Sequence, residues 1–336
     1  NKTPITVELP PLTDSEKCKL ANERYHEYIS NAMQTSVINV VSSGLSEQDN
    51  DMLQVLCKQT KKSAAKVKLA KEFHPQKTTI CVVPVELHGD INEEHAMSRN
   101  RTLKVMRAQL AGIPIVPPAW VTLCIQQEKV VEPTSSMYIR TLPTKTEQLV
   151  ATAAAGDTMP KIQLGVANHA ARIHQLEKGL LNQCSSVNVL ENVFVFLCGK
   201  FDASNGSPRK ADVTLLLREA GATILSSNAM VNKKLKSFSS VQEGSPPFTL
   251  IMLCDASTSD AQCGLSDGLA VACKKSVRES ENFVPPGRLL VVNSPWLFDS
   301  ISCGTKVTGD AYEPCSPRCK ELWTICQAKT LVKNNS

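Results

Sequence analysis

The stretch Ile113-Pro-Ile-Val-Pro-Pro-Ala-Trp120 decides the fold of this chain, because its pattern returns in Leu289-Leu-Val-Val-Asn-Ser-Pro-Trp296. Each copy is a short apolar run, a break marked by proline and a tryptophan, after which an apolar helical segment begins. Two of the three tryptophans in the chain occupy the same place in this pattern. The repeat indicates two copies of one small module. We expect Trp120 and Trp296 to be structural core residues, because tryptophan at the start of an apolar helix is mostly buried.

The overall composition limits the class of protein. With 336 residues, the chain is long enough for two domains that each have a core. A hydrophobic content of 42% and a charged content of 21% are typical of globular proteins. No apolar stretch reaches the roughly 18 residues that span a bilayer, so no membrane partner is expected. The net charge of +5 is mild and does not by itself indicate nucleic acid.

The thirteen cysteines have spacings that favour neither a metal site nor a disulfide framework. The sequence contains no C-x-x-C, and Cys81, Cys124, Cys198 and Cys254 lie inside apolar runs. In such runs cysteine behaves as a small core residue, so we expect free thiols in a reducing compartment. The histidines show no ligand or triad spacing, and no metal or cofactor is implied.

The order of apolar runs predicts an α/β fold. A first module is expected at residues 34–140, with strands at 36–41, 66–69, 79–85 and 113–116 and helices from Ser46, over 98–111 and from Pro118. A second module is expected at 190–328, with strands at 193–197, 223–225, 248–253 and 289–292 and helices over 211–220, over 265–276 and from Pro295. A serine-rich loop is expected before the third strand of the second module. Strands separated by helices favour a small, mostly parallel sheet covered on both faces.

Two further segments flank the modules. Residues 1–33 are expected to form an N-terminal extension that is partly helical. Residues 141–189, rich in Ala, Thr, Gln and Asn, are expected to link the modules and to include a helix near 166–181.

The order of elements, with a tryptophan opening the last helix, resembles the BRCT module, the C-terminal repeat of the breast-cancer susceptibility protein. The tryptophan copies and the turn Glu219-Ala-Gly-Ala-Thr223 carry the likeness in the second module. In the first module, Val41-Ser-Ser-Gly-Leu45 and Arg101-Thr-Leu-Lys104 look like the phosphopeptide-binding motifs of the family, and the latter region is most like that of DNA-damage checkpoint mediators. The resemblance implies two tandem BRCT modules, each a four-stranded parallel sheet flanked by three helices. It also implies a nuclear adaptor in DNA-damage response or repair that binds proteins and is not an enzyme.

The residues of these two motifs can hold a phosphate group. Gly44 lets a backbone N–H approach an anion closely, and Ser43 offers a hydroxyl donor. Both precede a helix N-terminus, which favours anions. Lys104 adds a compact positive charge, and Thr102 is placed to orient it. We therefore expect Ser43, Gly44, Thr102 and Lys104 to bind a phosphoserine, with Arg101, Lys104 and Arg107 on one helical stripe and Lys104 exposed.

The resemblance further implies a groove between the modules for the residue three places after the phosphoserine. Met106, Leu216 and Phe298 map to that pocket, and Arg101 maps to a residue that grips the peptide backbone. Ordinary packing between the modules is the alternative interpretation of the first three. The second module carries Cys198-Gly199 at the place of the first motif and no Thr-x-Lys pair, so one phosphate site is expected.

Other interpretations stay open on the sequence alone. Ser-Gly after a strand is often a simple turn, and Arg-Thr-Leu-Lys is often a solvated helix face. A BRCT pair can also act as a phosphate-independent scaffold that binds a protein or DNA through basic residues, although the sequence does not indicate a DNA partner. An enzyme on a nucleotide-binding α/β fold is disfavoured, because neither G-x-G-x-x-G nor G-x-x-x-x-G-K-[ST] follows a strand.

Overall fold

The computed structural model describes about three fifths of the chain. The described residues are 37–85, 97–98, 100–133, 137, 139–141, 189–203, 208–238, 248–255, 259–279, 288–303, 306–307 and 309–334. The expected N-terminal extension and the helix expected near 166–181 lie outside these residues.

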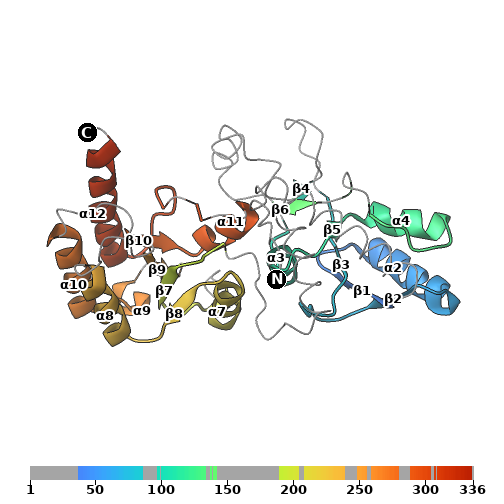
Figure 1. Cartoon of the computed structure of the whole chain (residues 1–336), viewed down its shortest axis with the longest axis horizontal. Coiled ribbons are helices and arrows are strands. Elements are labelled where there is room, and N and C mark those ends of the chain that lie inside the picture. Colours follow the sequence, from blue (N-terminus) through green and yellow to red (C-terminus); the bar gives the residue numbers. More distant parts are fainter. Residues whose placement is uncertain are drawn as a thin grey trace, which may run out of the picture.

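Two four-stranded parallel sheets form the centres of the two modules, as the sequence predicts (Figure 1). The first has the order β2-β1-β3-β5, with β1 Val37–Ser42, β2 Lys66–Leu69, β3 Ile80–Val82 and β5 Ile115–Val116. The second has the order β8-β7-β9-β10, with β7 Val193–Cys198, β8 Thr223–Leu225, β9 Thr249–Cys254 and β10 Arg288–Asn293. In each sheet the first strand of the module lies between the second and the third. The shared order shows that the repeat in the sequence is a repeat in structure.

Helices cover both sheets. The first module has α2 Glu47–Gln59, the short 3-10 helix η1 Thr60–Lys62, α3 Leu103–Leu110 and α4 Pro118–Gln126. The second has α7 Lys210–Glu219, α8 Asn228–Phe238, α9 Asp260–Cys263, α10 Asp267–Glu279, α11 Pro295–Cys303 and α12 Pro317–Asn334. A two-stranded parallel ladder joins β4 Met97–Ser98 to β6 Arg140–Thr141. Of the helices in the described ranges, none has the length and apolar character that crossing a membrane requires.

The two repeated tryptophans are equivalent in structure. Trp120 and Trp296 are both fully buried, each near the start of the helix that directly follows the fourth strand of its sheet. The indole N–H of Trp120 donates to the carbonyl of Val131 at 2.8 Å, and that of Trp296 donates to the carbonyl of Val307 at 3.0 Å. Each acceptor is 11 residues downstream. The predicted core role of both residues is confirmed.

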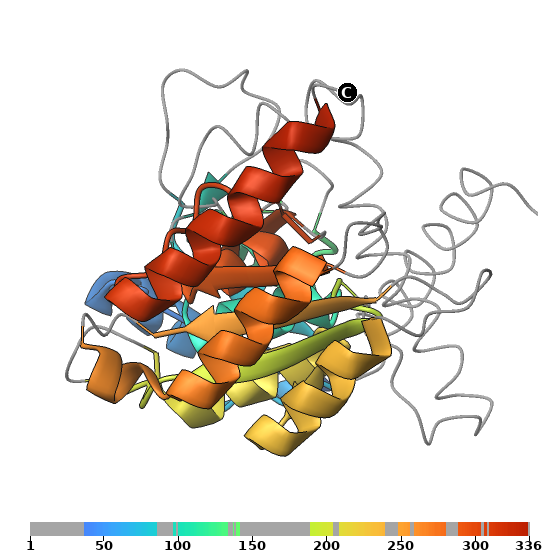
Figure 2. The ribbon, with the colours of Figure 1, turned by 90° about the vertical axis from the view of Figure 1, so that its left-hand side faces the viewer.

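The second module contains more helix than the sequence predicts. The expectation of a serine-rich loop before β9 is wrong over residues 228–238, which form α8. Ser227 accepts a hydrogen bond from the N–H of Met230 and so caps the helix start, and Val231 and Leu235 bury one face. The helix α12 is likewise not predicted from the sequence. Figure 2 shows α8, α10 and α12 side by side on one face of the second sheet.

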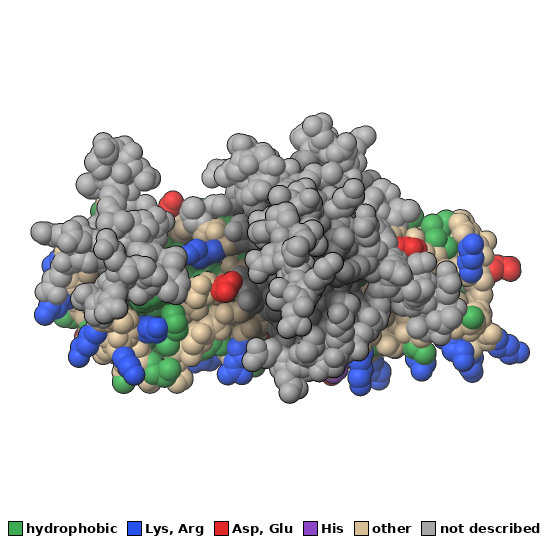
Figure 3. Space-filling view, in the orientation of Figure 1, with side chains coloured by type: hydrophobic (Ala, Val, Ile, Leu, Met, Phe, Trp, Pro, Cys, Tyr) green, Lys and Arg blue, Asp and Glu red, His purple; other side chains and the backbone are tan. Residues whose placement is uncertain are grey.

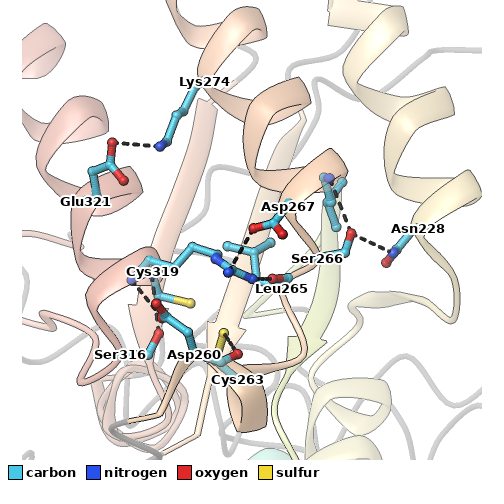
Figure 4. Close-up of polar contacts among 12 residues, drawn as sticks. Asn228, Asp260, Cys263, Leu265, Ser266, Asp267, Lys274, Ser316, Cys319 and Glu321 are labelled. Atoms are coloured by element: carbon cyan, nitrogen blue, oxygen red, sulfur yellow. Dashed lines mark hydrogen bonds and ion pairs between the residues drawn. The ribbon is translucent and has the colours of Figure 1, made fainter.

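Polar contacts fix α12 to its neighbours (Figure 4). The N–H of Arg318 donates to Asp260 at 2.9 Å, and its guanidinium contacts the carbonyl of Leu265 at 2.6 Å and the carboxylate of Asp267 at 2.8 Å. One arginine therefore joins the start of α12 to α9, to the start of α10 and to the connection between them.

The two modules share one apolar core along α3. Met106 and Leu110 of α3 belong to the same buried cluster as Leu216 of α7 and Leu297 of α11. Figure 1 shows α3 in the middle of the molecule, beside α7 and α11. A helix of the first module thus packs into the second module.

Polar groups add specificity to this interface. The side-chain amide of Gln109 donates to the carbonyls of Ile301 and Ser302 at 2.9 and 3.0 Å, which satisfies backbone acceptors at the end of α11. The hydroxyl of Thr141 is 2.9 Å from that of Ser302. These contacts fix the position of α3 along α11, because Gln109 can reach its two acceptors from one position only.

Candidate functional site

The end of β1 meets the start of α3 at the two predicted phosphate-binding motifs. The hydroxyl oxygens of Ser43 and Thr102 are 2.6 Å apart, although 59 residues separate them in sequence. Ser43 follows β1, and Thr102 is the residue before the first turn of α3. The two motifs meet because β1 is a central strand of the parallel sheet and its carboxyl end faces the loop that leads into α3.

Position 44 requires glycine, because a side chain would not fit there. Its φ of +70° lies in the left-handed region, and a Cβ atom there would be 2.2 Å from Nδ2 of Asn100. The same Nδ2 donates to the carbonyl of Ser43 at 2.8 Å. The glycine therefore allows the loop before α3 to approach the turn after β1.

Asn100 is a site residue that the sequence analysis missed. Its amide N–H₂ holds the carbonyl of Ser43, and its Oδ1 accepts a weak bond from the N–H of Thr102 at 3.4 Å. Its own N–H donates to Ser98 at 3.1 Å. One side chain thus connects the two halves of the site. The feature of the sequence that could have identified Asn100 is its short amide side chain directly before Arg101-Thr-Leu-Lys104.

Lys104 lies against the end of β1. Its Nζ donates to the carbonyl of Ser42 at 3.3 Å, one residue before Ser43. The expectation that Lys104 is exposed is wrong, because the residue is half-buried. Among the described residues, no carboxylate lies within ion-pair distance of it. Its positive charge is therefore not neutralised by the described part of the protein.

Ser43, Gly44, Thr102 and Lys104 form a small polar cluster, which we call the strand-end cup. It presents two hydroxyl groups, one of which donates its proton to the other, and one ammonium group. The backbone N–H of Ser43 is already used, since it donates to the carbonyl of Val82 at 3.1 Å. The N–H of Gly44 makes no hydrogen bond with a described residue. The cup therefore offers donors of the kind that a phosphate accepts.

The N-terminus of α2 lies beside the cup but contributes little to anion binding. Ser46 caps this helix by accepting from the N–H of Asp49 at 3.1 Å. Glu47 and Asp49 stand in its first turn. These carboxylates offset the positive end of the helix dipole, so Lys104 is the main source of positive charge in the cup.

The prediction that Arg101, Lys104 and Arg107 share one helical stripe is wrong for Arg101. The helix predicted over 98–111 begins only at Leu103, so Arg101 stands before it. The guanidinium of Arg101 pairs with the fully buried carboxylate of Asp299 on α11 and lies 5.5 Å from the ring centre of Phe298. Arg101 thus links the cup to the second module.

The residues predicted to recognise the third position after the phosphoserine lie at the interface of the modules. Met106 and Leu216 are buried, with 0% and 1% of their surface exposed, in one shared cluster. Phe298 is half-buried and packs against the same cluster. All three therefore pack between the modules, and their contact with a peptide stays a prediction.

The second module has a different turn at the equivalent place. Gly199 follows β7 with φ +133°, and a Cβ there would be 2.2 Å from the carboxyl carbon of Asp255. Asp255 follows β9, is buried, and accepts from the N–H of Phe201 at 3.1 Å. A buried carboxylate thus fills the space beside this turn, and an anion there would meet a negative charge.

Most of the described cysteines are core residues, as the sequence predicts, whereas Cys315 is exposed. Cys81, Cys124, Cys198 and Cys254 are all buried free thiols. Burial raises the pKa of the Cys81 thiol to about 12, and the charge of Lys104 opposes this rise. Within the described residues, no group of three His, Cys, Asp or Glu side chains is arranged to hold a metal ion.

Comparisons with known proteins found likeness in structure only. No family model matches the chain, and no curated protein matches it. The solved structure of the BRCT5-BRCT6 domains of S. pombe Brc1 superposes with a TM-score of 0.44 at 12% identity, over 80% of this chain and 93% of that chain. Yeast Rtt107, solved with Mms22 and with Slx4, gives a TM-score of 0.21 at 12% identity in each case, over 81% of this chain and 47% of that chain. At these TM-scores and identities, the likenesses carry no conclusion about the role of this chain or about any residue of the cup.

Proposed function

We propose that the chain is a tandem BRCT reader that binds a phosphoserine peptide through the strand-end cup. The observation that carries this proposal is the 2.6 Å contact between the hydroxyls of Ser43 and Thr102, with the ammonium group of Lys104 at the same strand end. Two segments that are distant in sequence supply donors to one place. A phosphate dianion is the common ligand that accepts several such donors at once.

The expected energies are sufficient for a useful affinity. Hydrogen bonds to a charged group contribute about 1.5–3 kcal/mol each. Three of them, from Ser43, the N–H of Gly44 and Lys104, supply much of the roughly 8 kcal/mol that corresponds to micromolar binding. The remainder comes from residues of the peptide that follow the phosphoserine. We propose that they lie along the interface near Arg101 and Phe298.

The broader role follows from the resemblance to BRCT proteins. We propose an adaptor in the nucleus that joins partner proteins during DNA-damage response or repair and does not act as an enzyme. The fold has the tandem arrangement that such adaptors use, and the buried interface holds the two modules in one orientation, which a peptide that crosses both modules requires.

The decisive experiment is a calorimetric titration of a Ser-x-x-Phe peptide in phosphorylated and unphosphorylated forms. The wild-type chain is expected to bind only the phosphorylated form. Lys104→Glu is expected to abolish this binding because it places a negative charge against the phosphate. Lys129→Glu makes the same change of charge at an exposed position outside the cup and serves as the control.

Two outcomes would contradict the proposal. Equal affinity of Lys104→Glu and wild type for the phosphopeptide would exclude the cup as the binding site. A protein partner captured from a lysate that stays bound after phosphatase treatment would favour the phosphate-independent scaffold. Circular dichroism of Lys104→Glu separates loss of binding from loss of fold.

A further inference from the structure

Positive charge is concentrated in one short segment of the first module. Residues 58–77 contain seven lysines and one acidic residue, Glu72, a net charge of +6, whereas the whole chain has +5. All seven lysines are exposed. Among the described residues, no carboxylate lies within ion-pair distance of any of them. The segment therefore carries a large positive charge, and none of its lysines has an ion-pair partner among the described residues.

The fold spreads this charge over one edge of the first sheet. The segment begins at the end of α2, passes through η1, and forms β2, the edge strand of the sheet. On β2, Val67 is buried with residues of α2, so Lys66 and Lys68 point to the opposite face. Their partners on β1, Val37 and Asn39, are exposed and half-buried, so none of the described helices covers this part of the sheet.

The remaining lysines extend the charge on both sides of β2. Lys61 and Lys62 lie before the strand in η1, and Lys71 and Lys77 lie in the connection to β3. We call the exposed lysines of residues 58–77 the lysine margin. In Figure 3, Lys and Arg side chains are visible along the lower edge of the molecule below β2. The Asp and Glu side chains visible in this view lie higher.

Protection of an edge strand does not explain the lysine margin. Lysine on an edge strand discourages pairing with another chain. However, only Lys66 and Lys68 are on β2, and the other five lysines are outside it. A concentration of charge on three successive elements, with one carboxylate among them, indicates a polyanionic partner.

We propose that the lysine margin binds the phosphate backbone of double-stranded DNA. The margin contains no arginine for bidentate contacts to base edges, and its one Phe, Phe73, is buried and cannot stack an unpaired base. Lysines alone favour contacts to backbone phosphates that do not depend on sequence. The choice of a DNA duplex over an RNA duplex rests on the proposed nuclear function. The margin lies outside the strand-end cup, so both ligands can bind one molecule.

The test is fluorescence anisotropy with a labelled DNA duplex of mixed sequence, measured at several salt concentrations. The double variant Lys66→Glu and Lys68→Glu is expected to bind more weakly. Its plot of log affinity against log salt is expected to lose about two units of slope, because each phosphate contact contributes about 0.9. Lys129→Glu with Lys200→Glu makes the same change of charge at exposed positions outside the lysine margin and is expected to bind like the wild type.

The phosphopeptide distinguishes this proposal from the function proposed above. The Lys66 and Lys68 double variant is expected to bind the phosphopeptide normally, whereas Lys104→Glu is expected to keep its affinity for the duplex. The proposal is overturned if the double variant and the wild type bind the duplex equally, or if the wild type does not bind it at low salt. Equal or tighter binding of a polyglutamate peptide or an RNA duplex would likewise overturn it, in favour of an acidic protein or of RNA.

Discussion

Arg107 of the first module and Glu219 of the second form a bidentate ion pair across the interface. Nε of Arg107 is 3.0 and 2.9 Å from the two carboxylate oxygens, and its terminal nitrogen is 2.6 Å from one of them. The guanidinium also lies 4.9 Å from the ring centre of Phe73. Both charged side chains are mostly buried, with 16% and 21% exposed. The pair therefore joins α3 to the end of α7 where water screens it little.

Removal of the carboxylate charge should weaken the interface. Glu219→Gln is expected to lower the free energy of unfolding by about 1–3 kcal/mol, because the mostly buried Arg107 loses its charged partner. Urea denaturation measures this change. Glu321→Gln is the control, since Glu321 pairs with Lys274 but is 59% exposed. The control should lose at most about 1 kcal/mol. Equal losses in both variants would show that the ion pair between Arg107 and Glu219 stabilises the protein no more than an exposed ion pair does.

A methyl group at Gly44 should damage the strand-end cup. Gly44→Ala must accommodate a φ of +70° and displace the amide of Asn100. We expect a loss of about 1 kcal/mol or more in stability and a weaker affinity for the phosphopeptide. Gly268→Ala is the control, because it is in α10 with open space around its Cβ and should stabilise the protein by up to about 1 kcal/mol. Wild-type phosphopeptide affinity in Gly44→Ala would show that the cup does not depend on this turn.

The buried tryptophans should act through folding and not through binding. Trp296→Phe removes the N–H that bonds the carbonyl of Val307, and leaving this buried acceptor unsatisfied costs about 1–3 kcal/mol. Trp296→Ala should cost about 3–5 kcal/mol because it also leaves a cavity. Trp323→Phe is the comparison, since Trp323 bonds the carbonyl of Gly309 at 3.2 Å but is only half-buried. Thermal denaturation should rank Trp296→Ala, Trp296→Phe and Trp323→Phe from the largest loss to the smallest.

Stability should fall in alkaline solution because of the buried thiols. The pKa of Cys81 rises from 9.0 to about 12 in the folded protein. Below pH 9 the thiol is protonated in both states, so its effect on stability is constant. Between pH 9 and about 12 the unfolded chain releases the proton and the folded chain does not, so stability falls as pH rises, by up to about 1.4 kcal/mol per pH unit. Urea denaturation above pH 9 should show a shallower decline for Cys81→Ala than for the wild type. Equal slopes would contradict the assignment.

The sequence was sufficient to predict the two sheets and their cores. Continuous apolar runs such as Val193–Cys198 and Thr249–Cys254 are typical of strands that are buried on both faces, and the paired tryptophans located the helix after the fourth strand of each module. The helix α8 was missed for a local reason. Ser226 and Ser227 are typical of loops, but serine is also a common helix cap, and the pattern does not distinguish these uses.

The candidate site was predictable in part. Ser43, Gly44, Thr102 and Lys104 follow from local motifs, and the structure brings these motifs together. Asn100 and the partner of Arg101 were not predictable, because both depend on contacts between distant segments. The bond from Asn100 to Ser43 spans 57 residues, and the pair of Arg101 with Asp299 spans 198. No periodicity in the sequence specifies such contacts.

The position of α3 has a practical consequence for dissecting the protein. One short helix supplies Lys104 to the cup and Met106, Arg107 and Leu110 to the neighbouring module. A fragment that ends before β7 would leave these apolar side chains in water and Arg107 without its carboxylate. Expression of the first half by itself should therefore give an aggregation-prone product, and ligand studies require both halves in one polypeptide.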